Sequence, residues 1–260
     1  MKKSFLTIGT GIVLLAGVIL YALSHPASAP APESGIVAGA GASLPPGVYT
    51  EHAPYYDIAA NYATSTPLAE NAGARADAAA VSSMRDFVAS TIDRFKTDGN
   101  FAHLTPEDVK MRGFDGGRAE TLQIVYLMSS SARTVSYIFT VYEDTGGAHG
   151  NTFFHTFTFD SSTGAPLALA DLFIPGADYL GTLSSLARAK LPAIIGDGAD
   201  AQMLDNGTAP DAKNFENFFL DNGNLDILFA PYAVAPYAAG PQTLPVPLAD
   251  LSRILKPEYR

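Results

Sequence analysis

The feature that most constrains the fold is a glycine-rich connection between two alternating stretches. Apolar or aromatic residues occupy every second position on both sides: Val135, Tyr137, Phe139 and Val141 before it, and Phe153, His155, Phe157 and Phe159 after it. This period of two is typical of strands that bury one face. The connection contains Gly146, Gly147 and Gly150, which predicts left-handed or otherwise strained backbone that only glycine adopts at low cost. We therefore expect a hairpin shaped by these three glycines.

Patterns before this hairpin predict a small unit of strands and one helix. Residues 55–62 and 122–128 alternate as strands. Apolar side chains at spacings of three and four predict a helix from Ala69 to Lys96 that ends at Asp98-Gly99. Thr105-Pro106-Glu107 indicates the start of a short helix.

Patterns after the hairpin predict a second unit of the same kind. Leu180, Leu183, Ala187 and Leu191 share one helical face, and Pro192 is expected to end that helix. Residues 196–213 indicate a loop, and Asn222-Gly223 between apolar runs predicts a hairpin. The fold class that follows is α+β, with antiparallel sheets packed against helices in two small consecutive units.

Charge and composition exclude several classes of function. Without residues 1–25, which carry Lys2 and Lys3 and no acid, 14 basic residues face 26 acidic ones, a formal charge of −12. Nucleic acid is therefore not an expected partner, whereas a cationic protein is compatible with this charge. The chain has no cysteine, which excludes disulfides, thiolate catalysis and a cysteine zinc site.

The N-terminus carries the pattern of a membrane anchor. An uncharged run from Phe5 to Leu23 follows Lys2 and Lys3 and has about the length of a transmembrane helix. The positive-inside bias places Met1 in the cytoplasm and the chain beyond residue 24 outside, at the cell membrane as a single-pass protein. Cleavage after Ala29 is the alternative, but Pro30 would then be the first mature residue, so an uncleaved anchor is favoured.

The chain then divides into four segments. Residues 1–24 form the expected anchor, and residues 25–47, rich in Pro, Ala and Gly, form a flexible stalk. The first α+β domain is expected at residues 48–149 and the second at residues 150–260.

Three motifs in this order resemble a known family. They are the loop Thr145–Gly150, the Asp160-x-x-x-Gly164 turn followed by Asp171-Leu172-Phe173, and Ala235-Pro236-Tyr237-Ala238-Ala239-Gly240 before Leu244-Pro245-Val246-Pro247. Together they resemble the paired domains of unknown function 4163 and 3298, the first over residues 48–149 and the second over residues 150–260. Such domains form the extracellular part of RsiV-type anti-sigma factors, which bind lysozyme, and the non-catalytic part of PdaC-type peptidoglycan deacetylases.

The resemblance implies a binding or sensing module of the bacterial cell envelope. Only four residues precede the hydrophobic run, so an anti-sigma role is not expected to transfer, and no deacetylase motif is found. The partners that the resemblance implies are a lysozyme-like muramidase or the glycan of peptidoglycan.

Few residues offer catalytic chemistry, and we expect no enzyme, no metal site and no cofactor. His149 and His155 with Asp160 are the types of residue that hold metals or transfer protons. His155 shares the face of three phenylalanines, which favours a hydrogen-bonded core histidine. His149 either caps strand ends or lines a pocket. The chain contains no nucleophile elbow, zinc-protease, phosphate-loop or dinucleotide motif.

Three functions remain open at the level of sequence. The leading one is an anchored binding module whose candidate binding residues are His149, Tyr232 and Tyr237, because prolines hold the two tyrosines in a low-entropy loop suited to a contact surface. Packing of these tyrosines on the domain's own helix is the alternative for that loop. The other two functions are a structural envelope protein without a specific ligand and a small hydrolase using His149.

Overall fold

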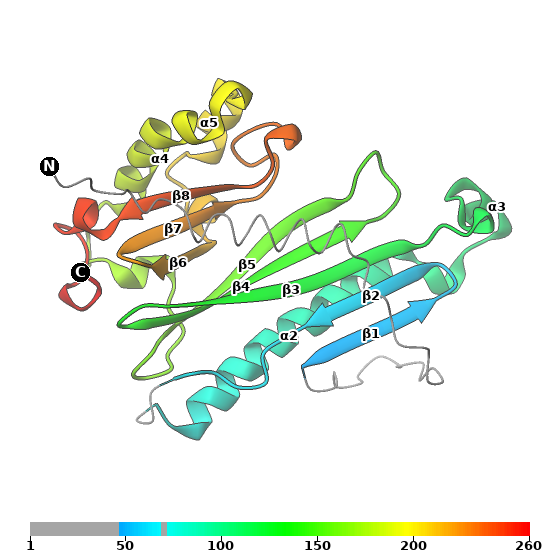
Figure 1. The fold of residues 1–260 in the computed structure, drawn as a ribbon, viewed down its shortest axis with the longest axis horizontal. Coiled ribbons are helices and arrows are strands. Elements are labelled where there is room, and N and C mark those ends of the chain that lie inside the picture. Colours follow the sequence, from blue (N-terminus) through cyan, green and yellow to red (C-terminus); the bar gives the residue numbers. More distant parts are fainter. Residues whose placement is uncertain (1–46, 69–71) are drawn as a thin grey trace, which may run out of the picture. The chain divides into compact units, whose positions relative to one another are not determined.

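The computed structural model describes residues 47–68 and 72–260, which build two sheets (Figure 1). The first sheet has five strands in the order β1-β2-β3-β4-β5, and the second has three in the order β6-β7-β8. The strands are β1 (Val48–Ala53), β2 (Tyr56–Asn61), β3 (Glu120–Ser130), β4 (Thr134–Asp144), β5 (Asn151–Asp160), β6 (Phe218–Asp221), β7 (Asn224–Phe229) and β8 (Gln242–Pro247). The expected anchor, and the stalk as far as residue 46, lie outside the described residues.

One pair of strands is parallel, which corrects the expectation of purely antiparallel sheets. β2 runs parallel to β3, with Ile58 opposite Leu122, whereas the other neighbouring strands are antiparallel. Helix α2 (Gly73–Gly99) connects β2 to β3, so the chain crosses over one face of the sheet and re-enters in the same direction. Such a crossover is the connection that a parallel pair requires.

The predicted apolar stripe of α2 forms the first core. Met84, Val88, Ile92 and Phe95 are buried against side chains that alternate along the sheet, such as Leu122. Figure 1 shows α2 running along this sheet. We call the face that packs on α2 the inner face and the opposite one the outer face. The prediction of a long helix ending at Asp98-Gly99 is confirmed.

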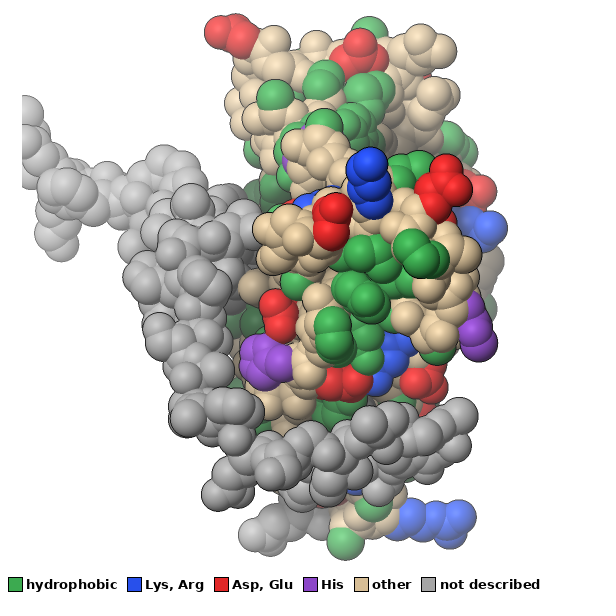
Figure 2. Space-filling model, turned by 90° about the vertical axis from the view of Figure 1, so that its right-hand side faces the viewer, with side chains coloured by type: hydrophobic (Ala, Val, Ile, Leu, Met, Phe, Trp, Pro, Cys, Tyr) green, Lys and Arg blue, Asp and Glu red, His purple; other side chains and the backbone are tan. Residues whose placement is uncertain are grey.

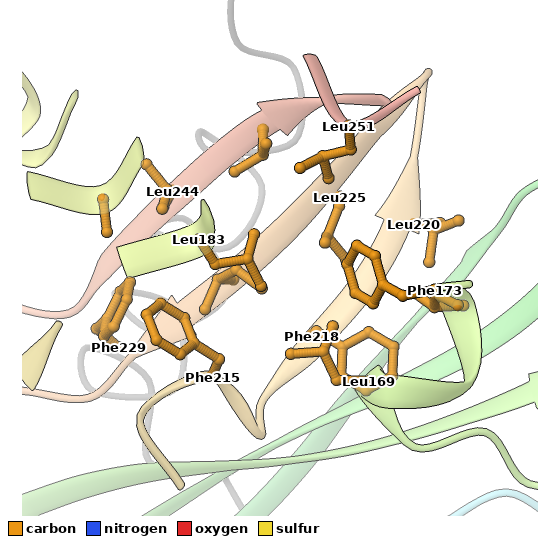
Figure 3. Packing of buried hydrophobic residues seen from close by; sticks show 14 of the residues in the cluster. Leu169, Phe173, Leu183, Phe215, Phe218, Leu220, Leu225, Phe229, Leu244 and Leu251 are labelled. Atoms are coloured by element: carbon orange, nitrogen blue, oxygen red, sulfur yellow. The ribbon is translucent and has the colours of Figure 1, made fainter. Parts of the chain in front are cut away.

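The second core lies between the small sheet and α4 (Tyr179–Ile195), as Figure 3 shows for Leu183 beside Phe215, Leu225 and Leu244. The expected helix end at Pro192 is wrong, because α4 continues to Ile195. A proline removes one backbone N–H, and at Pro192 that loss falls in the last turn, where it is tolerated more easily. Gly196, with φ +69°, follows the helix end.

The expected loop at residues 196–213 contains a helix, α5 (Ala201–Gly207). The Asp200 side chain accepts a hydrogen bond from the Met203 amide and so caps its first turn. The Asp, Asn and Gly residues of this segment cap the helix or pack closely against neighbours, so they do not form the loop that their composition indicated. The Asn222-Gly223 hairpin is confirmed, with φ of +47° and +81° at its two turn residues.

The two sheets meet through β6, which contacts the outer face of the first sheet. The Thr158 hydroxyl donates to the Phe218 carbonyl at 3.2 Å, and the Ser129 hydroxyl donates to the Leu220 carbonyl at 3.1 Å. β5 pairs with β4 along its whole length, so the first sheet extends to Asp160. The boundary expected at residue 150 therefore does not separate the two sheets.

A short helix, α3 (Pro106–Met111), stands at one end of the first sheet. The predicted start is confirmed, since the Thr105 side chain accepts a hydrogen bond from the Asp108 amide and Pro106 is the first helical residue. Figure 2 views the molecule from the side on which Figure 1 draws α3, and apolar side chains gather there between acidic and basic ones.

Candidate functional site

The glycine-rich loop between β4 and β5 is shaped by two of its three glycines. Gly146 has a φ of +96°, where a side chain would be strained. Gly150 is needed for space, because a Cβ there would lie 2.3 Å from the ring of Tyr142. Gly147 has no positive φ, and a Cβ there would lie 3.6 Å from the His149 carbonyl oxygen, which is an ordinary van der Waals contact. The expectation that all three glycines are structurally required is therefore wrong for Gly147.

The structure brings together the three side chains proposed as binding residues. The His149 ring stacks on Tyr237, with centroids 3.7 Å apart and planes at 16°. His149 Nε2 lies 3.2 Å from the Tyr232 hydroxyl, and the Tyr232 and Tyr237 rings are 5.5 Å apart. We call these three residues the ring cluster. His149 comes from the β4–β5 loop and the tyrosines come from the segment between β7 and β8, so tertiary folding assembles the cluster.

Hydrogen bonds to one carbonyl hold the ring cluster in place. The Tyr237 hydroxyl donates to the Gly150 carbonyl at 3.0 Å, and His149 Nδ1 lies 3.0 Å from the same oxygen. A carbonyl oxygen only accepts, so Nδ1 carries the hydrogen and donates. In the neutral ring Nε2 is then the acceptor for the Tyr232 hydroxyl. His149 is thus oriented by both of its nitrogens.

Tyr232 has the most unusual backbone of the cluster. Its φ is +70°, a region that bulky residues rarely occupy, and 53% of its surface is exposed. The cost of such a conformation is on the order of 1 to 3 kcal/mol, and it persists where the surrounding structure holds it. Here Gly207 of α5 packs closely against the residue after Tyr232, since a Cβ at Gly207 would lie 1.9 Å from the Ala233 carbonyl oxygen. This packing helps to hold the loop backbone in place.

Tyr142 is a fourth ring that the sequence did not single out. It lies near the end of β4 on the outer face, and its ring covers Gly150. Burial, followed by the nearby Asp144 and Tyr237, raises the pKa of its hydroxyl. The period-two pattern of residues 135–141 places Tyr142 on the opposite face from Val141. Only the fold shows that this position lies next to the ring cluster.

The other residues considered for chemistry lie apart from the ring cluster in role and contacts. His155 stacks on Phe87 of α2 at 4.4 Å, and the partial burial of its ring lowers its pKa. It is more than a third exposed and makes no hydrogen bond within the described residues, so the expected hydrogen-bonded core histidine is wrong. Asp160 accepts hydrogen bonds from Ser162 and Thr163 and pairs with Arg133 at 3.0 Å. These contacts stabilise the turn after β5, so the role of Asp160 is structural. Residues 47–68 and 72–260 contain no group of three or more side chains able to hold a metal ion.

The fold is of the α+β class, with two sheets packed against helices. Its candidate site is a surface where aromatic side chains from two loops meet. Residues 170–249 match the family model described as Protein of unknown function (DUF3298), so this part of the chain carries a DUF3298 domain. The expected 3298-like character of the second half is confirmed over those residues. The 4163-like character of residues 48–149 and the likeness to RsiV-type proteins stay predictions.

Relatives include a peptidoglycan-N-acetylmuramic acid deacetylase, PdaC, from Bacillus subtilis, which is 37% identical over 49% of this chain and 27% of its own length. The esterase Rv3036c from Mycobacterium tuberculosis is 27% identical over 44% of this chain and 49% of its own length. The chain thus spans about a quarter and about half of these two curated relatives.

A solved structure supports the fold. It is a DUF3298 family member from Bacteroides fragilis, which aligns with a TM-score of 0.55 at 20% identity over 80% of this chain and 91% of that one.

In the part of the chain that the structure describes, no helix is both long and apolar enough to cross a bilayer.

Proposed function

We propose that this chain is a membrane-anchored, extracytoplasmic binding and sensing module of the bacterial cell envelope, and that it is not an enzyme. The ring cluster is its contact surface for a cationic protein such as a lysozyme-like muramidase, and the glycan of the cell wall is the second candidate ligand of the chain. The observation that carries this proposal is the assembly of His149, Tyr232 and Tyr237 into one hydrogen-bonded cluster from two separate loops.

The build of the cluster favours contact with a partner over internal packing. Tyr237 is half-buried and fixed by Gly150, whereas Tyr232 and His149 are exposed. A rigid aromatic side chain that loses little entropy on binding is the type of residue that dominates binding energy at interfaces. The backbone at Tyr232 is strained, and strained residues that the surrounding structure holds in place cluster at binding sites.

Charge supports a cationic partner. The −12 formal charge beyond residue 25 attracts a basic protein at long range and raises the rate of encounter. Such attraction is not specific by itself. The aromatic contact supplies the part of the affinity that salt does not screen.

The geometry of His149 supports the proposed lack of catalysis. Its ring nitrogens face the Gly150 carbonyl and the Tyr232 hydroxyl, and no serine or threonine hydroxyl within the described residues hydrogen-bonds to it. A nucleophile and its base normally lie within hydrogen-bond reach of each other. A hydrolase that uses His149 would therefore lack an aliphatic hydroxyl nucleophile at this position.

Titration calorimetry of the full chain in detergent against a cationic muramidase tests the proposal. Binding is expected to persist near 1 M salt, where the Debye length is about 3 Å. Tyr232→Ala and Tyr237→Ala are each expected to weaken binding about tenfold or more. Met111→Ala, a change at another exposed apolar side chain, serves as the matched control and should have no effect.

Two results would support the alternatives instead. Binding that disappears at high salt, or that both tyrosine changes leave intact, would reduce the interaction to charge attraction and favour a structural envelope protein. Hydrolysis of a model ester that is lost in His149→Ala would favour the small hydrolase.

A further inference from the structure

The outer face of the first sheet carries two polar rows in register beside the ring cluster. In the first row His52 lies opposite Asp57, Asp57 opposite Thr121, and Thr121 opposite Asp144. In the second row the strand partners are Thr50, Ala59, Gln123, Tyr142 and Thr152. β6 contacts this face at its other end, near Ser129 and Thr158.

The charges on this face are already paired. His52 Nδ1 lies 2.6 Å from the Asp57 carboxylate, and Arg118 lies 3.2 Å from Asp144. The two rows therefore carry at most one net negative charge, in spite of the acidic composition of the chain. A surface with so little net charge offers weak electrostatic attraction to a cationic protein or a nucleic acid, and it fits an uncharged polymer.

The neutral side chains here have unused hydrogen-bonding capacity. Within the described residues, no hydrogen bond engages the side chains of Thr50, Thr121, Gln123 or Tyr142. Thr50 is exposed, and the other three are half-buried. The apolar residue between Thr50 and Gln123, Ala59, is too small to anchor a protein partner. Hydroxyl and amide groups beside an aromatic ring suit the hydroxyl, acetamido and C–H groups of a sugar.

The geometry points to a carbohydrate site: we propose that the outer face of β1–β4 binds a neutral, linear chain of β-linked N-acetylhexosamine. Neighbouring strands lie about 4.8 Å apart, so the rows from β1 to β4 extend about 14 Å, enough for a short oligosaccharide. Gln123 meets the acetamido group, Thr121 meets ring hydroxyls, and Tyr142 stacks on a sugar face. This inference rests on the proposed envelope function and gives the glycan a face separate from the ring cluster.

Calorimetric titration of the full chain with the hexamer of N-acetylglucosamine tests this site. Saturable binding is expected for the wild type. Gln123→Ala and Thr121→Val each remove one hydrogen bond and should weaken binding about two- to tenfold. Gln202→Ala, the same change on the exposed surface of α5, is the matched control and should leave binding unchanged.

The outcomes separate this inference from the proposed function. Absence of saturable binding by the wild type, or full affinity in both Gln123→Ala and Thr121→Val, would overturn the carbohydrate site whatever the muramidase result. Loss of muramidase binding in Tyr232→Ala with unchanged hexamer binding would support two separate surfaces. Circular dichroism verifies that each variant is folded, and Gln123→Glu, which keeps the side-chain size, provides a second test if Gln123→Ala unfolds.

Discussion

At the residue scale, Gly150 makes the ring cluster possible. Its carbonyl accepts from Tyr237 and His149, and its lack of a side chain lets the Tyr142 ring lie against the backbone. The same loop shows why glycines are not equivalent. Gly146 is required for its φ of +96°, Gly150 for space, and Gly147 for neither reason.

Substitution at two of these glycines tests this distinction. Gly150→Ala should lower the free energy of unfolding by about 1 to 3 kcal/mol, because the added methyl group overpacks against Tyr142. Gly147→Ala, the matched control, should change it by no more than about 0.5 kcal/mol. Urea unfolding measures both values, and equal losses in the two variants would contradict the assignment.

Asp226 on β7 is a second residue with a definite consequence. It is 9% exposed and makes no hydrogen bond or ion pair within the described residues. Burial, and next the charge of Asp221, raise its pKa from 3.8 to about 7. Between these two values the folded state holds a proton that the unfolded state has lost, so stability falls as pH rises from about 4 to 7.

Asp226→Asn should remove this pH dependence. We expect the variant to melt at a higher temperature than the wild type at pH 8, and the difference should shrink towards pH 4, where Asp226 is protonated in the folded protein. Thermal unfolding at several pH values measures the difference. A constant difference across this range would show that Asp226 is not the group responsible.

At the element scale, the end of α3 is attached to the first sheet by a buried ion pair. Arg112 pairs with Glu120 at 2.5 Å, and its guanidinium lies 4.9 Å from the centroid of the Phe114 ring. Glu120 is fully buried, and among the described residues its Oε2 has no hydrogen-bond partner. The buried negative charge of Glu120 is therefore balanced by Arg112.

Removal of that arginine should be costly. Arg112→Met is expected to destabilise the protein by about 3 to 5 kcal/mol, since it leaves a buried charge without a partner. Lys190→Met breaks the exposed pair with Asp250 and should cost less than about 1 kcal/mol. Addition of Glu120→Gln to Arg112→Met should recover part of the loss. Similar values for the two single variants would contradict the role assigned to the buried pair.

At the scale of the whole molecule, the ring cluster joins the two halves of the chain. His149 belongs to a loop of the first sheet, and Tyr232 and Tyr237 belong to the loop before β8. A ligand at this cluster would contact both halves at once. The placement of these halves outside the membrane is a proposal that depends on the N-terminal sequence.

The expected anchor makes a prediction that mass spectrometry decides. We expect the intact chain to begin at or next to Met1 and to fractionate with membranes, because lysines lie on one side only of the run from Phe5 to Leu23. Domains beyond residue 24 should be accessible from outside the cell. A mature start near residue 30 would reject the anchor and indicate a secreted protein.

Local patterns determined the elements that depend on neighbours in sequence. The alternation around Gly146 predicted β4 and β5, the apolar stripe predicted α2, and Asn222-Gly223 predicted the β6–β7 turn. These features follow from side-chain period and backbone preference, which the sequence displays directly. The candidate residues His149, Tyr232 and Tyr237 were also within reach of the sequence, as loop residues of a suitable type.

Contacts between distant segments required the tertiary structure. The parallel pairing of β2 with β3, the helical state of α5, the close approach at Gly150 and the place of Tyr142 beside the ring cluster each involve partners that no local period specifies. Register can be inferred from one strand only when its partner is known, and two loops meet only after both sheets have packed. The sequence by itself therefore determined which elements form, and the tertiary structure decided which side chains meet.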